Sequence, residues 1–111
     1  MNITDTKTDK AIIVKIEGRI DAVTTSDAEN YFNKLVVDTN DHIIVDCKDL
    51  DYINSSGLRI LIMSLKKQKA KNKEMLLANL QKNIKDVFKF SGFTNLFDIE
   101  LDTEAALQKL A

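Results

Sequence analysis

The stretch from Asp49 to Leu61, DLDYINSSGLRIL, lies between two apolar segments of different periodicity. Before it, residues 43–47 (IIVDC) form a short, nearly continuous apolar run, which is typical of a strand buried on both faces. From the turn onward, apolar residues recur at the i, i+3, i+4, i+7 spacing of a helix, at Leu58, Leu61, Ile62 and Leu65. The pattern predicts a chain that leaves a strand and starts a helix near Ser55 or Ser56.

The rest of the chain alternates in the same way. Apolar, β-branched segments predict strands at residues 11–17, 75–78 and 96–101, and Gly18 ends the regular pattern of the first one. Helices are predicted after a capping box at residues 26–29, around residues 84–88, and over residues 103–110. Strand–helix units of this length favour a mostly parallel sheet of about four or five strands with crossover helices. We therefore predict one small α/β domain over residues 1–111.

Composition limits the classes of function. The chain has 111 residues, of which 44% are apolar and 30% charged, as in ordinary folded domains. A net charge of −1 predicts no recruitment of nucleic acid. Neither a membrane-length apolar run nor a signal-peptide pattern is visible, so we expect a cytoplasmic protein that is monomeric when free. One histidine and one cysteine offer too few ligands for a metal site, and we expect no cofactor; Cys47 is predicted to be a small buried apolar residue.

The small polar residues Asn54 to Gly57 are consistent with more than one role. At a helix start, Asn and Ser side chains accept hydrogen bonds from free backbone N–H groups, so the turn can be a helix cap. A catalytic serine needs a base, but the turn lacks the G-x-S-x-G form, and the only histidine, His42, falls at the start of another predicted strand. A phosphate-binding loop needs more glycine and a following lysine.

The same turn also suits a phosphorylation switch. A phosphate adds roughly −1.5 to −2 charges to a serine. The N-terminus of a helix tolerates this charge, because free N–H groups and the helix dipole face it. The fold then stays unchanged while the surface that a partner meets changes strongly. From the residues alone, the cap and the switch both remain open.

Four segments of the chain match short sequence motifs that occur together, in this order and at this spacing, in one protein family. VKIEGRIDAVTT (residues 14–25) is a strand followed by G-x-[IL]-D, and HIIVDCKDLDYI (residues 42–53) is a buried strand that leads into the turn. DLDYINSSGLRILI (residues 49–62) is close to a D-S-S/T-G-L motif, and VFKFSGFTNLFDI (residues 87–99) to F-x-x-[ST]-G-[LF]. These segments resemble the STAS-domain family of bacterial anti-sigma-factor antagonists and cover nearly the whole chain.

The resemblance implies a regulatory cycle without enzymatic activity of its own. In this family the unmodified domain binds an ATP-dependent serine kinase that is also an anti-sigma factor, and a sigma factor is released. The kinase phosphorylates a serine in the turn, which breaks the complex, and a phosphatase resets it. Other members are not phosphorylated and act as scaffolds of signalling assemblies or as accessory subunits of lipid transporters.

Carried over by position, the phosphorylated serine is Ser56, with Ser55 as the second candidate and Gly57 after it. The acidic residue that follows the family's first glycine is Asp21, which we expect at the mouth of a neighbouring loop. Asn54 departs from the motif, which commonly has aspartate there. Asn keeps a capping oxygen but removes a carboxylate, so a phosphate on Ser56 meets less repulsion. A kinase that orients the hydroxyl through that carboxylate would modify this turn slowly or not at all.

Two residues beyond the turn complete the predicted partner surface, which otherwise consists of Asp21, Asn54, Ser55 and Gly57. Arg59, one turn into the helix, can reach a carboxylate of a partner. Phe93 follows a glycine that stops a helix, so a loop can expose it.

The remaining features have simpler interpretations. We expect the other late phenylalanines, at positions 88, 90 and 97, to lie in the core, and the lysine-rich end of the central helix, residues 66–73, to be a solvated face. A receiver-like phosphoacceptor at Asp46 also fits a small α/β fold. Receivers hold Mg²⁺ with clustered acidic residues after the first strand, but residues 11–19 offer only Glu17.

Overall fold

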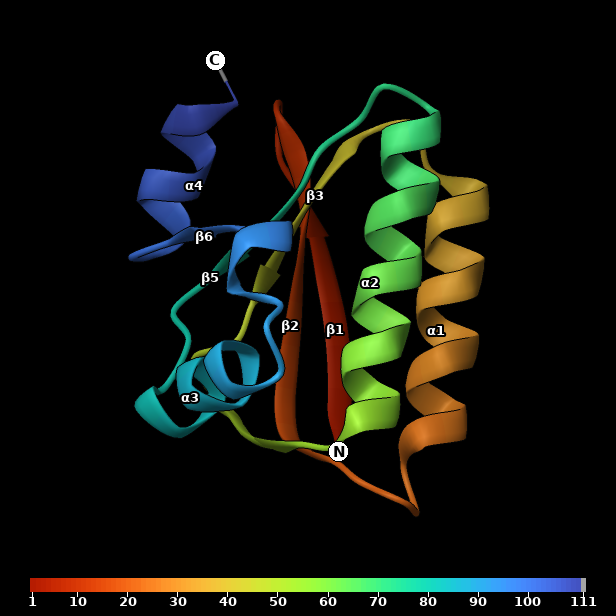
Figure 1. Ribbon diagram of the computed structural model, residues 1–111. Helices are drawn as coiled ribbons and strands as arrows, with labels where there is room; N and C mark the ends of the chain where they lie inside the picture. Colours follow the sequence, from red (N-terminus) through yellow and green to blue (C-terminus); the bar gives the residue numbers. More distant parts are fainter. Residues whose placement is uncertain (111) are drawn as a thin grey trace.

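The computed structural model describes residues 1–110 and contains six strands, four α-helices and one 3₁₀ turn (Figure 1). The strands are β1 (Asn2–Lys7), β2 (Ala11–Ile20), β3 (His42–Asp46), β4 (Leu50–Ile53), β5 (Met75–Ala78) and β6 (Asp98–Glu100). The helices are α1 (Thr25–Asp38), α2 (Ser55–Ala70), α3 (Lys82–Phe90) and α4 (Thr103–Lys109), and the 3₁₀ turn is η1 (Thr94–Leu96). Within residues 1–110, no helix has the length and apolar character that crossing a membrane requires.

β2 is the strand to which most of the sheet is joined. β1 pairs with it antiparallel. β3 pairs with residues 11–15 of β2 and β4 with its residues 18–20, both in parallel. β5 and β6 extend the parallel sheet from β3, which gives the order β1-β2-β3-β5-β6 with β4 beside the end of β2. The predicted α/β class, with a mostly parallel sheet and crossover helices, is confirmed, although the sheet has six strands.

Two apolar clusters fill the two faces of the sheet. Alternation along β3 sends Ile43 and Val45 into the larger cluster and Ile44 into the smaller one. The larger cluster contains residues of α1, α2 and α3, whereas α4 packs on the smaller one. Because both faces of the central strands are covered, these strands have the continuous apolar sequences that predicted them. Cys47 is buried in the larger cluster as expected, and burial raises the pKa of its thiol.

Two strands were not predicted. β1 (NITDTK) is an almost wholly exposed edge strand, so its residues carry no apolar pattern. β4 has only four residues and follows β3 after a tight turn, in which the backbone N–H of Leu50 donates to the carbonyl of Cys47 at 3.1 Å. β2 also continues past Gly18, where φ is +99° and the pairing register shifts, to Ile20. This bulge carries the end of β2 alongside β4.

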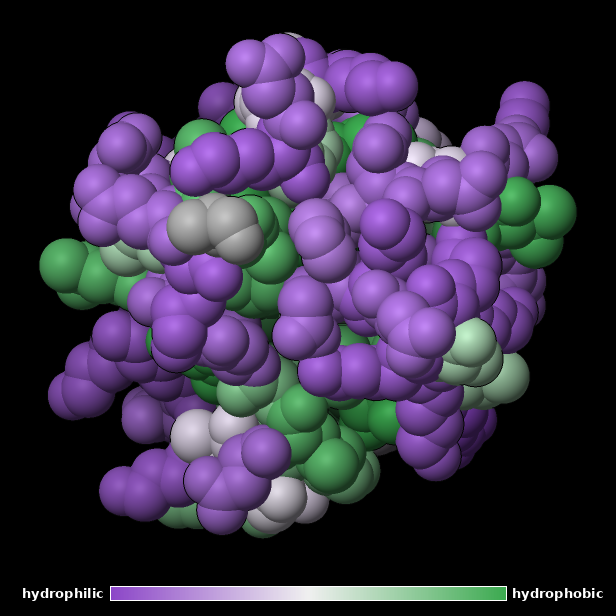
Figure 2. Space-filling view, turned by 90° about the horizontal axis from the view of Figure 1, so that it is seen from above, coloured by the Kyte–Doolittle hydropathy of each residue, from purple (hydrophilic) through white to green (hydrophobic). Residues whose placement is uncertain are grey.

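The C-terminal end of α2 is less solvated than expected. The ammonium group of Lys71 donates to the backbone carbonyls of Val36 and, at 2.5 Å, of Thr39, near the end of α1. Lys69 forms an ion pair with Glu74. Part of the lysine-rich segment therefore satisfies helix-terminal carbonyls and ties α1 to α2. Hydrophilic residues cover most of this end of the molecule, which Figure 2 views from above.

The late phenylalanines divide between core and surface. Phe88 and Phe97 are buried and meet edge to face, with ring centroids 5.5 Å apart. Phe93 is half-buried against the same cluster. Phe90 is 84% exposed, so its predicted place in the core is wrong. It lies two residues after Phe88 on α3, and residues at that spacing do not share a helix face.

Candidate functional site

The Asn54–Gly57 turn lies at a strand-to-helix junction, as predicted. β4 ends at Ile53, and α2 begins at Ser55 with Asn54 as its N-cap. The side-chain oxygen of Asn54 accepts a hydrogen bond from the backbone N–H of Gly57 at 2.8 Å. The backbone N–H of Asn54 donates to the carbonyl of Ile20 at 3.0 Å. The turn is therefore bound to the end of β2 on one side and to its own helix on the other.

Asn54, and not a serine, is the helix cap. The hydroxyl groups of Ser55 and Ser56 make no hydrogen bond within residues 1–110, and α2 has no acidic residue in its first turn. Ser55 is exposed and Ser56 is partly exposed. The cap interpretation of this turn thus applies to Asn54 alone, and neither serine hydroxyl stabilises the turn by a hydrogen bond to the described residues.

Gly57 lets the start of α2 press against the sheet. It is buried, and a Cβ atom at this position would lie 2.6 Å from Cγ1 of Ile53 and 2.8 Å from Cγ2 of Ile20. Real Cβ atoms do not approach side-chain carbons so closely. Gly57 therefore sets the height of the turn above the sheet, and its burial gives it a packing role in place of the surface contact that we predicted.

Asp21 organises the loop that follows β2, next to the turn. Its carboxylate accepts hydrogen bonds from the backbone N–H groups of Val23 at 3.0 Å and Thr24 at 3.2 Å. Partial burial acts to raise the pKa of Asp21, but these hydrogen bonds, the hydroxyl of Thr24 and the guanidinium of Arg19 outweigh it and hold the pKa below its usual value. The side chain of Asp21 keeps 32% of its surface exposed, so it both holds the loop and remains accessible.

The prediction of a capping box at the start of α1 is wrong, because the residue before the helix makes its hydrogen bonds within the Asp21 loop. α1 begins at Thr25, one residue before Ser26, and its N-cap is Thr24, which makes no side-chain cap hydrogen bond. The hydroxyl of Thr24 instead accepts from the N–H of Asp21 at 2.9 Å and donates to the carbonyl of Arg19 at 2.8 Å. The loop uses its threonine to fix Asp21, and α1 starts without a side-chain cap.

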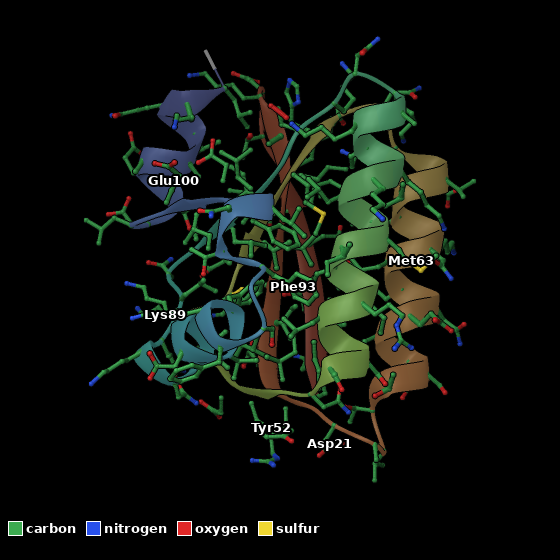
Figure 3. All side chains as sticks on the ribbon, viewed as in Figure 1. Asp21, Tyr52, Met63, Lys89, Phe93 and Glu100 are labelled. Carbon is green, nitrogen blue, oxygen red and sulfur yellow. The ribbon has the colours of Figure 1, made fainter. Side chains whose placement is uncertain are left out.

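Arg19 and Tyr52 form an exposed pair beside Asp21 that the sequence did not reveal. The guanidinium carbon of Arg19 lies 4.3 Å from the centroid of the Tyr52 ring, and its Nε is 3.5 Å from a carboxylate oxygen of Asp21. Tyr52 is 39% exposed. Figure 3 places Tyr52 and Asp21 at the same end of the molecule. Only the register between β2 and β4 brings these residues together, and β4 was not predicted.

The exposed face of α2 continues from the turn. Ser56, Arg59 and Met63 follow one another at i, i+3 and i+7, so they lie on one side of the helix. Arg59 is exposed and makes no ion pair within residues 1–110. Met63 is 48% exposed and was not among the predicted contacts.

Phe93 is positioned by a helix-terminating motif. Gly92, with φ of +77°, ends α3, and its N–H donates to the carbonyl of Lys89 at 3.1 Å. The N–H of Phe93 donates to the carbonyl of Phe88 at 2.9 Å, which completes a Schellman motif. This geometry turns the chain back toward the core, and Phe93, labelled in Figure 3, is consequently half-buried against the larger cluster.

His42 cannot serve a serine of the turn. It begins β3 opposite Ala11, whereas the turn is bound to Ile20. Ala11 and Ile20 are the two ends of β2, roughly 30 Å apart for a strand of this length. The Nδ1 atom of His42 accepts a hydrogen bond from the N–H of Glu74 at 2.9 Å, which gives it the strand-flanking place that its position predicted.

The carboxylate of Asp46 is engaged in hydrogen bonds within the fold. Its carboxylate accepts from the N–H of Lys48 at 3.1 Å and from the side-chain amide of Asn79 at 3.0 Å. No group of three His, Cys, Asp or Glu side chains that can hold a metal ion occurs within residues 1–110. The carboxylate of Asp46 holds the turn after β3, and the geometry gives no support to a receiver-like phosphoacceptor.

Comparison with known proteins gives one consistent family. The sequence pattern of the STAS domain matches residues 2–106. A Bordetella bronchiseptica protein, BtrV, described as a candidate anti-sigma factor antagonist, is 28% identical over 106 residues, which cover 96% of this chain and 91% of that protein. An anti-sigma-B factor antagonist of Staphylococcus aureus is 27% identical over 104 residues, 94% of this chain and 96% of its own.

Solved structures have the same fold. The unphosphorylated form of the anti-sigma factor antagonist SpoIIAA superposes with a TM-score of 0.80 at 17% identity, covering 97% of this chain and 96% of that one. SpoIIAA of Bacillus in its phosphorylated form gives a TM-score of 0.73, also at 17% identity, over 99% of this chain and all of that one. These two likenesses establish the fold.

Proposed function

The chain belongs to the STAS domain family, and from this premise we propose that it is an anti-sigma factor antagonist controlled by phosphorylation of Ser56. Unmodified, it binds an anti-sigma factor that is also an ATP-dependent serine kinase, and a sigma factor is thereby released. A phosphate on Ser56 ends this complex, and a phosphatase restores it. The protein acts by binding and not by catalysis, in the cytoplasm, as a monomer when free.

The observation that carries the proposal is that the turn is capped by Asn54 and not by either serine. Asn54 caps α2, so the hydroxyl groups of Ser55 and Ser56 hold nothing in place within residues 1–110. A phosphate can therefore be added without loss of a hydrogen bond that stabilises the turn. The helix start tolerates the added charge. Modification would change the surface that a partner meets and leave the fold intact.

The partner surface that we propose surrounds this turn. Ser55, Ser56 and Arg59 supply the start of α2, and Asp21 and Asn54 supply the neighbouring loop and cap. The half-buried ring of Phe93 adds an apolar contact, and we now add Met63 and the Arg19–Tyr52 pair. Tyr and Arg are frequent at the energetic centres of interfaces. Gly57 contributes by holding the turn at its height above the sheet.

The relatives support this assignment by their described activities. BtrV is described as a candidate anti-sigma factor antagonist and the Staphylococcus aureus protein as an anti-sigma-B factor antagonist, and both align over more than nine-tenths of this chain. SpoIIAA, which has this fold, exists in a phosphorylated and an unphosphorylated form. A domain of this fold therefore accepts a phosphate without unfolding.

The test is a binding experiment with three proteins against the anti-sigma kinase encoded beside the gene or copurified with the protein. Wild type and Ser56→Ala should bind the kinase alike without nucleotide, and only wild type should be released by Mg-ATP. Ser56→Glu should fold but lose most binding, because a negative charge enters an interface that is complementary to a neutral serine. Ser55→Ala is the matched control and should behave like wild type throughout. Calorimetric titration measures each affinity, and wild-type affinity of Ser56→Glu would contradict the proposal.

One observation favours a second candidate, a STAS scaffold that is never phosphorylated. Asn54 stands where the family motif commonly has aspartate, so a kinase that needs that carboxylate finds none in the turn. If Mg-ATP and kinase leave the turn unmodified, Asn54→Asp should be assayed next. Phosphorylation restored by this substitution would support the scaffold for the natural chain, because it would show that Asn54 blocks the modification.

A further inference from the structure

Arg59 lies where its side chain can meet a phosphate on Ser56. The two residues are three apart on α2, on the exposed side of the helix. Side chains three apart are neighbours on a helix surface. Helical side chains generally lean toward the N-terminus of their helix, so an arginine at position 59 has the length and direction to reach back over the first turn. A group added to the hydroxyl of Ser56 would extend into the space that the guanidinium can reach.

Nothing within residues 1–110 competes for the guanidinium of Arg59. It takes part in no ion pair or side-chain hydrogen bond there. The first turn of α2 contains no acidic residue, and its cap is the neutral Asn54. The nearby carboxylate of Asp21 is held by its own loop and by Arg19. Among the described residues, the guanidinium of Arg59 thus pairs with no anion and the hydroxyl of Ser56 with no hydrogen-bond partner, and both lie on the same helix face.

We propose that Arg59 is the intramolecular partner of the phosphate on Ser56, and that phosphorylation withdraws Arg59 from the partner protein. The proposal rests on the proposed function in taking Ser56 as the modified residue and Arg59 as part of the surface that binds the kinase. A planar guanidinium binds a phosphate with two parallel N–H···O bonds, which makes Arg better suited than Lys to this contact. In the unmodified protein the same guanidinium is free to bind a carboxylate of the kinase.

The consequence is an off-switch with two parts. The phosphate brings negative charge into the interface, and it also removes the arginine that a carboxylate of the partner requires. The partner's carboxylate then faces the phosphate on Ser56 and no longer binds Arg59, so both effects weaken the complex. A mere addition of charge at Ser56 would leave Arg59 available.

The test uses the isolated protein with phosphoserine installed at position 56 during translation, and therefore needs no kinase. At about 20 mM salt, phosphorylated Arg59→Gln should unfold about 1–3 °C below phosphorylated wild type. The unmodified forms of both should unfold at the same temperature. In ³¹P NMR titrations, Arg59→Gln should move the phosphoserine midpoint to higher pH, because a neighbouring cation favours the dianion. In Arg59→Lys the midpoint should lie between those of wild type and Arg59→Gln, because lysine keeps the positive charge. About 0.5 M salt should reduce the difference between wild type and Arg59→Gln.

Lys66→Gln is the matched control, because Lys66 is an exposed cation further along the same helix. It should move neither the titration midpoint nor the melting temperature of the phosphorylated protein. Equal midpoints for phosphorylated wild type and Arg59→Gln would overturn the pairing, as would an equal shift in Lys66→Gln. An equal fall in stability of both unmodified and phosphorylated Arg59→Gln would overturn it too, because Arg59 would then be merely structural. A kinase that never modifies Ser56 would defeat the proposed function and leave this result standing.

Discussion

For the stability of a Gly57→Ala protein, helix propensity and core packing predict opposite changes, and the structure favours the packing argument. Helix propensity alone predicts that Gly→Ala within a helix stabilises it by up to about 1 kcal/mol. The packing predicts the reverse, because the new Cβ would lie 2.6 Å from Cγ1 of Ile53 and 2.8 Å from Cγ2 of Ile20. Both isoleucines are buried and cannot move aside without disturbing the core. Overpacking of this kind costs about 1–3 kcal/mol.

The net expectation for Gly57→Ala is a loss of about 1–2 kcal/mol in the free energy of unfolding, or a melting temperature lower by roughly 5–10 °C. Urea and thermal unfolding followed by circular dichroism measure both. In an Ile53→Ala background the same substitution should cost less, because one of the two clashing side chains is gone. A Gly57→Ala protein that is as stable as wild type, or more stable, would refute the claim that Gly57 sets the height of the turn.

Three further predictions concern the groups that hold the turn and its surroundings. Asn54→Ala should lose about 0.5–2 kcal/mol of stability in urea unfolding, whereas Asn54→Asp, which keeps a capping oxygen, should stay close to wild type. The pKa of Asp21 is lowered on folding, so its carboxylate stabilises the fold above the ordinary value of about 3.9, and this contribution is lost as the pH falls through the folded pKa. The stability gap between wild type and Asp21→Asn should accordingly narrow below about pH 4 in unfolding experiments; a gap that widens there would contradict the assigned hydrogen bonds. Lys71→Ala should cost about 1 kcal/mol, because it frees two carbonyls near the end of α1, whereas Lys66→Ala should change stability by less than about 0.5 kcal/mol.

The sequence predicted those parts of the fold whose residues are buried on a regular pattern. β3 and β5 are covered on both faces and read as apolar runs, and α2 shows its buried side at helical spacing. β1 escaped prediction because an exposed edge strand has no apolar face to display. The SDAE sequence at residues 26–29 was misleading, because the hydroxyl that precedes α1 is used to fix Asp21.

The candidate site was predictable where it depends on one short segment. The strand-to-helix turn, the partly exposed Ser56 and the exposed Arg59 all follow from the spacing of residues 49–62. The choice of Asn54 over the serines as cap required the hydrogen bond to Gly57, which sequence leaves undetermined. The Arg19–Tyr52 pair depends on a register shift between two strands, and no local pattern encodes such a long-range pairing.

The central claim is that a phosphate on Ser56 switches the protein off. The most direct measurement is mass spectrometry of the protein after incubation with the anti-sigma kinase and Mg-ATP, combined with size-exclusion chromatography of the same sample. The account predicts one phosphate, located on Ser56 and not on Ser55, and elution of the modified protein free of the kinase. A phosphate on another residue, an unmodified turn, or a phosphorylated protein that still elutes in the complex would contradict it.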